Sequence, residues 1–233
     1  MVKMPLTNFD GKTFVAFIDI SGFKHLMKNG KAWEALDKLY KYGYEVLKGN
    51  NNLKNRVEGL FVSDCGILFV RYCQNNLECL KAILKVVKEI NKKMLNHDFL
   101  LTTSIAYGHF KYQERIEFEG IDKNTIYGNA YVSAFIDNEN GKPNIQPGQC
   151  RIVNKNLSPN IIQNIKQNSR DEILRMIRKR DDKDHYYFYW MREDPSEIER
   201  FEKEYSKFEK MSSNSKYTYI SKVLKGVYDV RQF

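Results

Sequence analysis

The sequence predicts an α+β fold with a ferredoxin-like βαββαβ core over residues 13–110, followed by further elements and a helical C-terminal extension. Apolar runs of strand length alternate with segments whose apolar residues recur at helical spacing. A short polar turn at residues 63–66 separates two of the strand-like runs, which is typical of a β-hairpin. Together these observations favour a sheet with helices over an all-helical or all-β fold.

The elements of the core follow in order. Residues 13–18 are continuously apolar, which indicates a strand covered on both faces. Over residues 24–48, Leu36, Leu39 and Leu47 fall on one helical face. Strands over residues 57–62 and 67–70 form the hairpin. An amphipathic helix over residues 77–94 and a strand over residues 99–110 complete the unit.

Weaker patterns organise the rest of the chain. We expect a protruding hairpin at 111–125, a helix at 127–136, a strand at 150–153, a charged helix at 171–180, an aromatic strand at 185–190, and helices at 195–211 and 217–225. These patterns predict a main domain at residues 1–155 and an extension at residues 156–233 that packs on it.

Composition restricts the setting of the protein. The chain has 233 residues, of which 42% are hydrophobic, enough for one packed domain with an elaboration. No apolar run reaches the roughly 20 residues of a bilayer span, and residues 1–12 lack the apolar h-region of a signal peptide, so we expect neither feature. The four cysteines form no CxxC pair, so we expect reduced thiols and a cytoplasmic protein. The net charge of +9 favours a polyanionic ligand: a nucleoside triphosphate, nucleic acid or an acidic membrane surface.

Two aspartates lie at the ends of apolar runs, Asp19 in FVAFIDISGF and Asp64 in VSDCGILFV. An ionised carboxylate at the end of a buried strand is costly unless a cation pairs with it. In the predicted topology the strand end at Asp19 lies beside the hairpin turn that holds Asp64. We therefore expect two carboxylates that are 45 residues apart in sequence to converge, where they can share a divalent metal.

The same residues resemble the motifs of class III nucleotide cyclases. FIDISGF (17–23) is similar to the FxDIxGF signature of that family, and SDCGILF (63–69) to its second aspartate motif. TTSIAYGHF (102–110) and IYGNAYVSAFIDNE (126–139) resemble its later strand and its YG helix, so the likeness spans residues 13–153. The resemblance implies the fold of a class III cyclase catalytic core and a homodimer with shared active sites.

The resemblance also implies roles for particular residues. Asp19 and Asp64 would bind two Mg²⁺ or Mn²⁺ ions with the backbone carbonyl of Ile20, which are the hard oxygen ligands that these ions prefer. The backbone N–H groups of Ser21, Gly22 and Phe23 would bind the triphosphate.

The chain departs from purine cyclases at four positions. Leu60 stands four residues before Asp64, where the family reads the base, and Thr125 occupies a second base-reading position. Val132 and Ile136 replace the usual transition-state Asn and Arg. Ordinary adenylate or guanylate cyclase activity is therefore not expected.

The pattern instead looks like the pyrimidine cyclases of bacterial anti-phage signalling systems. The matching positions are Gly128, Ala130, Tyr131, Ala134, Glu139 and Arg151. This likeness implies a phosphorus–oxygen lyase that converts UTP or CTP to a cyclic nucleotide for antiviral defence, and a separate cyclic-nucleotide-binding effector protein. Nothing in the sequence separates uracil from cytosine. Possible base or transition-state contacts are Leu60, Tyr131 and Arg151.

Other interpretations remain open. The chain is also consistent with an inactive nucleotide sensor, a purine cyclase with atypical base contacts, or a nucleic-acid-binding module. The last rests on HYYFYW and the basic stretch at 175–183, although no nucleic-acid motif accompanies them and no direct nucleic-acid or membrane partner is expected. Structurally, Asp19 could cap a helix, Asp64 could serve the turn, Tyr131 could be packed and Arg151 could be a surface cation.

Overall fold

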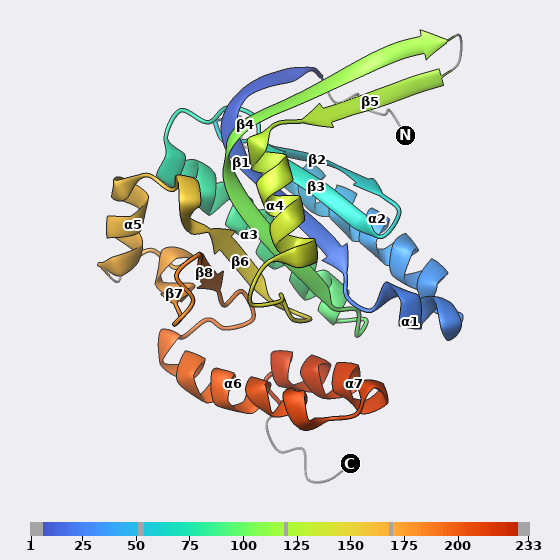
Figure 1. The fold of residues 1–233 in the computed structure, drawn as a ribbon, viewed down its shortest axis with the longest axis vertical. Helices are drawn as coiled ribbons and strands as arrows, with labels where there is room; N and C mark the ends of the chain where they lie inside the picture. The colour runs from blue at the N-terminus through green and yellow to red at the C-terminus, as the bar shows by residue number, and fades with distance from the viewer. Residues whose placement is uncertain (1–6, 51–53, 119–120, 168–169, 228–233) are drawn as a thin grey trace.

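The computed structural model describes residues 7–50, 54–118, 121–167 and 170–227. Over these residues eight strands form one mixed sheet in the order β2-β3-β1-β4-β6-β8-β7, with β5 paired to β4 (Figure 1). The strands are β1 (Phe9–Ile20), β2 (Val57–Val62), β3 (Cys65–Val70), β4 (Leu101–Phe118), β5 (Ile121–Tyr127), β6 (Cys150–Val153), β7 (Ile177–Lys179) and β8 (His185–Phe188).

Helices cover both faces of this sheet. The helices are α1 (Phe23–Lys28), α2 (Ala32–Gly49), α3 (Asn76–Leu95), α4 (Asn129–Asn140), α5 (Pro159–Lys166), α6 (Ile198–Tyr205) and α7 (Ser213–Leu224). Helices α2 and α3 lie on one face and α4 on the other (Figure 1). Short 3₁₀ turns occupy Asn154–Asn156, Leu174–Met176, Pro195–Glu197 and Ser206–Lys210.

Strand β1 shows how the sheet orients the first aspartate. Its even-numbered residues, such as Ile18 and Ile20, join the large core under α2 and α3, whereas Val15 and Phe17 join a second apolar cluster under α4. Because successive side chains of a strand alternate between faces, Asp19 belongs to the α4 face.

The predicted fold class is confirmed. The order β1-α-β2-β3-α3-β4 matches the βαββαβ unit, and β3 pairs antiparallel with both β1 and β2. The predicted protruding hairpin is also present, as β5 returns antiparallel along the outer half of β4.

Some predicted elements differ. The helix expected at residues 24–48 is two helices, because Gly30 adopts a φ of 68° after the end of α1. The charged helix expected at 171–180 is wrong: the chain forms a 3₁₀ turn and β7 there. Ile173, Leu174, Met176 and Ile177 are all buried, a spacing that a helix face would also give, but the pairing of β7 with β8 holds this segment in extended form. Helix α5 was not predicted.

The expectation of four reduced thiols is wrong for two of them. Cys73 and Cys79 form a disulfide with their Cα atoms 5.6 Å apart, whereas Cys65 and Cys150 are free. The Asn75 side chain caps α3 by accepting from the N–H groups of Leu77 and Glu78. Because α3 begins directly after Asn75, its first turn brings Cys79 close to Cys73, which precedes the helix.

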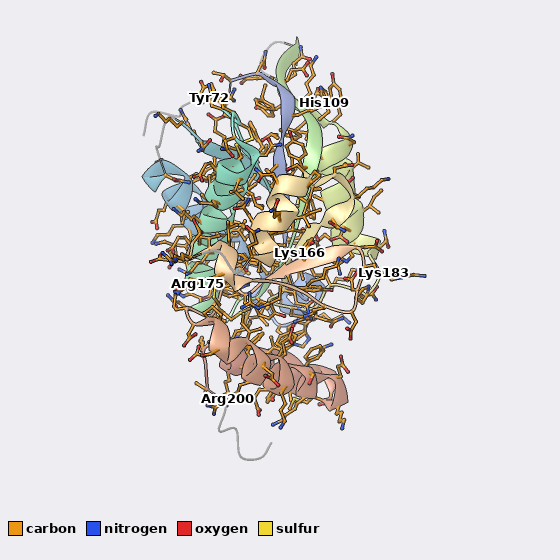
Figure 2. The ribbon with its side chains drawn as sticks, turned by 90° about the vertical axis from the view of Figure 1, so that its left-hand side faces the viewer. Tyr72, His109, Lys166, Arg175, Lys183 and Arg200 are labelled. Atoms are coloured by element: carbon orange, nitrogen blue, oxygen red, sulfur yellow. A yellow bond between two sulfur atoms is a disulfide. The ribbon has the colours of Figure 1, made fainter. Side chains whose placement is uncertain are left out.

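The C-terminal extension is continuous with the sheet. Strand β8 pairs antiparallel with β6, so the sheet runs without a break across residue 155. Helices α6 and α7 lie at one end of the long axis of the molecule and the β4–β5 hairpin at the other (Figures 1 and 2). Trp190 Nε1 donates to the carbonyl of Gly148 at 2.8 Å, and Tyr205 Oη donates to that of Pro147 at 2.6 Å. None of the described helices is both long enough and apolar enough to cross a bilayer.

Candidate functional site

The backbone joins the two aspartate motifs directly. The N–H of Ile20 donates to the carbonyl of Asp64 at 3.0 Å, and Asp19 stands opposite Cys65 in the β1–β3 register. Ser63 adopts a φ of 53°, which lets the chain reverse between Val62 and Cys65 in a two-residue turn. The predicted convergence of the strand end and the hairpin turn is thus present in the fold.

The electrostatics of Asp19 show that acids lie close together here. Asp19 is half-buried, and its pKa is raised from the ordinary 3.8 to about 7. Burial is the main cause, followed by the negative charges of Asp64 and of Glu139, at the end of α4. All three causes disfavour the ionised form, and none is offset by a cation.

The donor chemistry at this edge fits a divalent cation. Asp19 and Asp64 offer carboxylate oxygens, and Ile20, directly after Asp19, offers a backbone carbonyl oxygen. All of these candidate metal ligands are hard oxygens suited to Mg²⁺ or Mn²⁺. No cluster of three or more His, Cys, Asp and Glu side chains arranged to hold a metal occurs in the described parts of the chain. The site therefore rests on two acids and the backbone, with Glu139 as a nearby third charge.

Cys65 does not add a thiolate to this site. Burial, together with the charges of Asp19 and Asp64, raises the pKa of the Cys65 thiol to about 11, so it keeps its proton at neutral pH. Its Sγ donates to the carbonyl of Val62 at 3.1 Å.

An aromatic surface adjoins the acids on the α4 face. The rings of Phe17 and Phe135 meet edge to face with centroids 5.2 Å apart, and Tyr131 lies 6.1 Å from Phe135. Phe17 is two residues before Asp19 in β1, so the ring and the carboxylate share one face of the strand. Phe135 is 39% exposed and leaves an open aromatic face beside the acids.

Leu60 is not available for direct ligand contact within its own protomer. It is only 7% exposed and packs in the apolar cluster under α4 with Phe17 and Ile67. Val132 and Ile136, which replace the usual transition-state residues, are 46% and 52% exposed. Tyr131 is half-buried, as expected for a packed aromatic residue that keeps part of its surface open.

The structure places Arg151 in a structural role. Its side chain is fully buried, with Nε donating to Asp137 Oδ2 at 2.8 Å, Nη2 to the Asp137 carbonyl at 2.6 Å and Nη1 to the Pro143 carbonyl at 2.6 Å. Within this protomer all three nitrogens bind the protein, so the proposed contact of Arg151 with substrate or transition state is not supported. The reading as a surface cation is wrong as well.

Asp137 is the centre of a buried network that the sequence did not reveal. Its carboxylate also accepts from Ser104 Oγ at 2.6 Å and pairs with His185 Nε2 at 2.6 Å. The hydrogen bonds of His185, Ser104 and Arg151 outweigh burial and hold the pKa of Asp137 below its ordinary value. The sequence contains one indirect indication of this network. Arg151 is the only charged residue of the apolar strand β6, which implies a buried acidic partner but does not identify Asp137.

The triphosphate loop predicted at residues 21–23 is only partly free. The N–H of Ser21 donates to the carbonyl of Leu100 at 2.8 Å, whereas the N–H groups of Gly22 and Phe23 have no acceptor among the described residues. Gly22 adopts a φ of 72°, a conformation that favours glycine. The Ser21 hydroxyl is buried without a hydrogen-bond partner in the described structure.

Comparison with known proteins identifies the fold. No protein-family model and no curated protein matches the sequence. Among solved structures, the adenylyl cyclase CyaB from P. aeruginosa aligns with a TM-score of 0.55 at 16% identity, covering 78% of this chain and 96% of that one. A guanylyl cyclase domain from the aquatic fungus Blastocladiella emersonii aligns with a TM-score of 0.56 at 11% identity, covering 78% and 98%. The guanylate cyclase domain from Catenaria anguillulae, solved with GTP, aligns with a TM-score of 0.54 at 10% identity over the same shares of each chain.

The buried network predicts that Arg151 is required for stability. Replacing it in Arg151→Met leaves the Asp137 carboxylate buried without its main cation, which should cost on the order of 3–5 kcal/mol in the free energy of unfolding. Urea unfolding measures this change. Lys155→Ala, at an exposed position just after β6, is the control and should change stability by less than about 0.5 kcal/mol. A loss below about 1 kcal/mol in Arg151→Met would contradict the assigned role.

The raised pKa of Asp19 predicts a pH-dependent instability of the metal-free protein. Because the folded-state pKa lies above the unfolded value, stability should fall as pH rises from about 4 to about 7. Asp19→Asn removes this effect and should exceed wild type above pH 7 by on the order of 4 kcal/mol, with no difference near pH 4. Thermal unfolding in EDTA across this pH range tests the prediction. Equal melting temperatures of wild type and Asp19→Asn at every pH would show that the folded protein does not raise the pKa of Asp19.

Proposed function

We propose that the protein is a nucleotide cyclase that converts a pyrimidine nucleoside triphosphate, UTP or CTP, to the 3′,5′-cyclic nucleotide and diphosphate. The observation that carries the proposal is the pair of acids, Asp19 and Asp64, joined through the backbone at one sheet edge, where no cation in the described part of the chain offsets the raised pKa of Asp19. The shared fold with adenylyl and guanylyl cyclase domains supports it.

In the proposed reaction the ribose 3′-oxygen attacks the α-phosphorus, the bond to the diphosphate oxygen breaks and the 3′-hydroxyl loses its proton. Asp19, Asp64 and the Ile20 carbonyl would hold two divalent ions, Mg²⁺ or Mn²⁺, which when bound supply charge neutralisation at the attacking and leaving oxygens. The N–H groups of Gly22 and Phe23, which have no acceptor among the described residues, would bind the terminal phosphates.

The surroundings of the acids support a pyrimidine rather than a purine base. Leu60, at one base-reading position of purine cyclases, is buried, and Thr125 occupies the other, so neither offers the base contact that those enzymes use. The aromatic surface of Phe17, Tyr131 and Phe135 can stack on any base. By the same resemblance we assign the product as a second messenger in antiviral defence, made in the cytoplasm and detected by a separate cyclic-nucleotide-binding effector.

We further propose that the active species is a homodimer with shared sites. The α4 surface beside the acids exposes Val132, Phe135 and Ile136, and Val62 at the end of β2 is 53% exposed. Apolar residues gathered next to a polar site suit an interface with a second copy of the chain.

An inactive nucleotide sensor is the second candidate, because the burial of Arg151 removes one residue expected to act on the transition state. An assay with all four nucleoside triphosphates and Mn²⁺, read by mass spectrometry, separates these functions. Cyclic UMP or cyclic CMP is expected. Conversion of ATP or GTP alone would favour a purine cyclase, and binding without product would favour the sensor.

Removal of either acid should abolish cyclisation. Asp19→Ala and Asp64→Ala each lose a ligand of the shared metal site and should lower turnover at least about 100-fold while leaving the protein folded. Asp10→Ala, which removes an exposed acid paired with His109 and Lys111, is the matched control and should retain activity. Near wild-type turnover in either site variant would refute the assignment.

Shared sites predict complementation between damaged chains. In a shared site Tyr131 of one chain acts beside the acids of its partner. Mixing Asp19→Ala chains with Tyr131→Ala chains should then restore about a quarter of wild-type activity, because half of the dimers are mixed and each has one intact site. Subunit exchange is confirmed separately with differently tagged chains. Complete absence of rescue after exchange would place all contacts within one protomer.

A further inference from the structure

Helix α7 of the C-terminal extension touches the candidate phosphate loop. A β-carbon built on Gly22 would lie 2.5 Å from both Cζ and Oη of Tyr217, so the phenol end of Tyr217 fills the space that a side chain at Gly22 would need. Two features therefore require glycine at position 22: its φ of 72°, and the close approach of Tyr217. Figure 1 shows the corresponding arrangement, with α7 beside α1.

Tyr217 also contacts the first turn of α1. Its ring stacks on His25 with centroids 6.0 Å apart and an interplanar angle of 17°. The N–H of His25 donates to the carbonyl of Gly22 at 2.8 Å, and the N–H of Leu26 donates to the same carbonyl at 3.1 Å. Tyr217 therefore contacts Gly22, which accepts both hydrogen bonds, and His25, which donates one of them.

Helix α7 is held firmly enough to act as a support. Arg192 Nη2 donates to the Val223 carbonyl at 2.7 Å, a cation at the C-terminal end of the helix where its dipole is negative. Lys225 Nζ donates to Asp98 Oδ1 at 2.7 Å, and Ser221 Oγ donates to the same oxygen at 2.5 Å. These contacts join α7 to the segment after β8 and to the turn between α3 and β4.

A loop around a glycine loses much backbone freedom when it binds a ligand, and that cost falls when the protein already holds the loop in one conformation. In this protein the N–H of Ser21 is bonded to Leu100 on one side of the loop, and Tyr217 packs on Gly22. Removing the Tyr217 ring would leave Gly22 free to change conformation.

We propose that Tyr217 is a positioning residue for polyphosphate binding: through its contact with Gly22 and His25, α7 fixes loop 21–23 in the conformation that binds a metal–polyphosphate. The inference rests on the proposed function, because it assigns the loop to the triphosphate of the substrate. It makes the C-terminal extension part of the nucleotide site.

Two measurements test this positioning role. Hydrogen–deuterium exchange reports the protection of residues 21–26, and calorimetry with Mn²⁺ and inorganic tripolyphosphate reports affinity for the phosphate chain. Tyr217→Ala should speed exchange at the His25 and Leu26 amides at least tenfold and raise the tripolyphosphate Kd and the substrate KM about tenfold, with kcat changed less than about threefold. Tyr217→Phe keeps the ring and should stay within about twofold of wild type.

Two further variants make the comparison specific. Thr218→Ala, at the exposed neighbouring position on α7, is the control and should behave as wild type. His25→Ala removes the stacking partner without altering α7 and should shift exchange in the same direction, so the proposal stays testable if Tyr217→Ala does not fold. Wild-type exchange and wild-type tripolyphosphate affinity in the folded Tyr217→Ala or His25→Ala protein would overturn the proposal. If wild type cyclises no nucleotide, the proposed function fails, whereas the exchange data still decide the role of Tyr217.

Discussion

The geometry of the candidate site depends on the backbone hydrogen bond between Ile20 and Asp64. This hydrogen bond fixes the end of β1 against the β2–β3 turn and brings two carboxylates together on the face of the sheet under α4. Although the chain has a net charge of +9, no cation among the described residues lowers the pKa of Asp19. The fold therefore tolerates an electrostatic cost that a bound divalent ion would remove, which is the physical signature of a site rather than of a structural ion pair.

Helix α4 links this site to the interior. On its inner side Asp137 binds Arg151 and His185 in a buried hydrogen-bonded network, and on its outer side Phe135 and Ile136 are exposed. A buried ion pair contributes little net stability compared with apolar packing, but it permits few alternative positions of the helix. We interpret the network as the device that fixes α4, and with it Glu139, beside the acids.

The sequence predicted the parts of the fold in which apolar residues repeat regularly, including β1, the β2–β3 hairpin and α3. It failed where tertiary contacts decide the structure. Residues 171–180 carry many charges and resemble a solvated helix, yet Leu174, Met176 and Ile177 are buried because β7 pairs with β8. Arg151 resembles a surface cation because nothing nearby in sequence shows that Asp137 and Pro143 enclose it. The aspartate pair was predictable because strand order alone brings it together.

The C-terminal extension reaches the candidate site from two directions. Through β8, which continues the sheet beyond β6, it supplies His185 to the acid that anchors α4. Through α7 it supplies Tyr217 to the glycine of the phosphate loop. These contacts lie on different elements of the core, so displacement of the extension would loosen both the α4 side and the loop side of the site. An extension attached in this way couples the geometry of the acids to its own position, and any partner that moves it would also change the site.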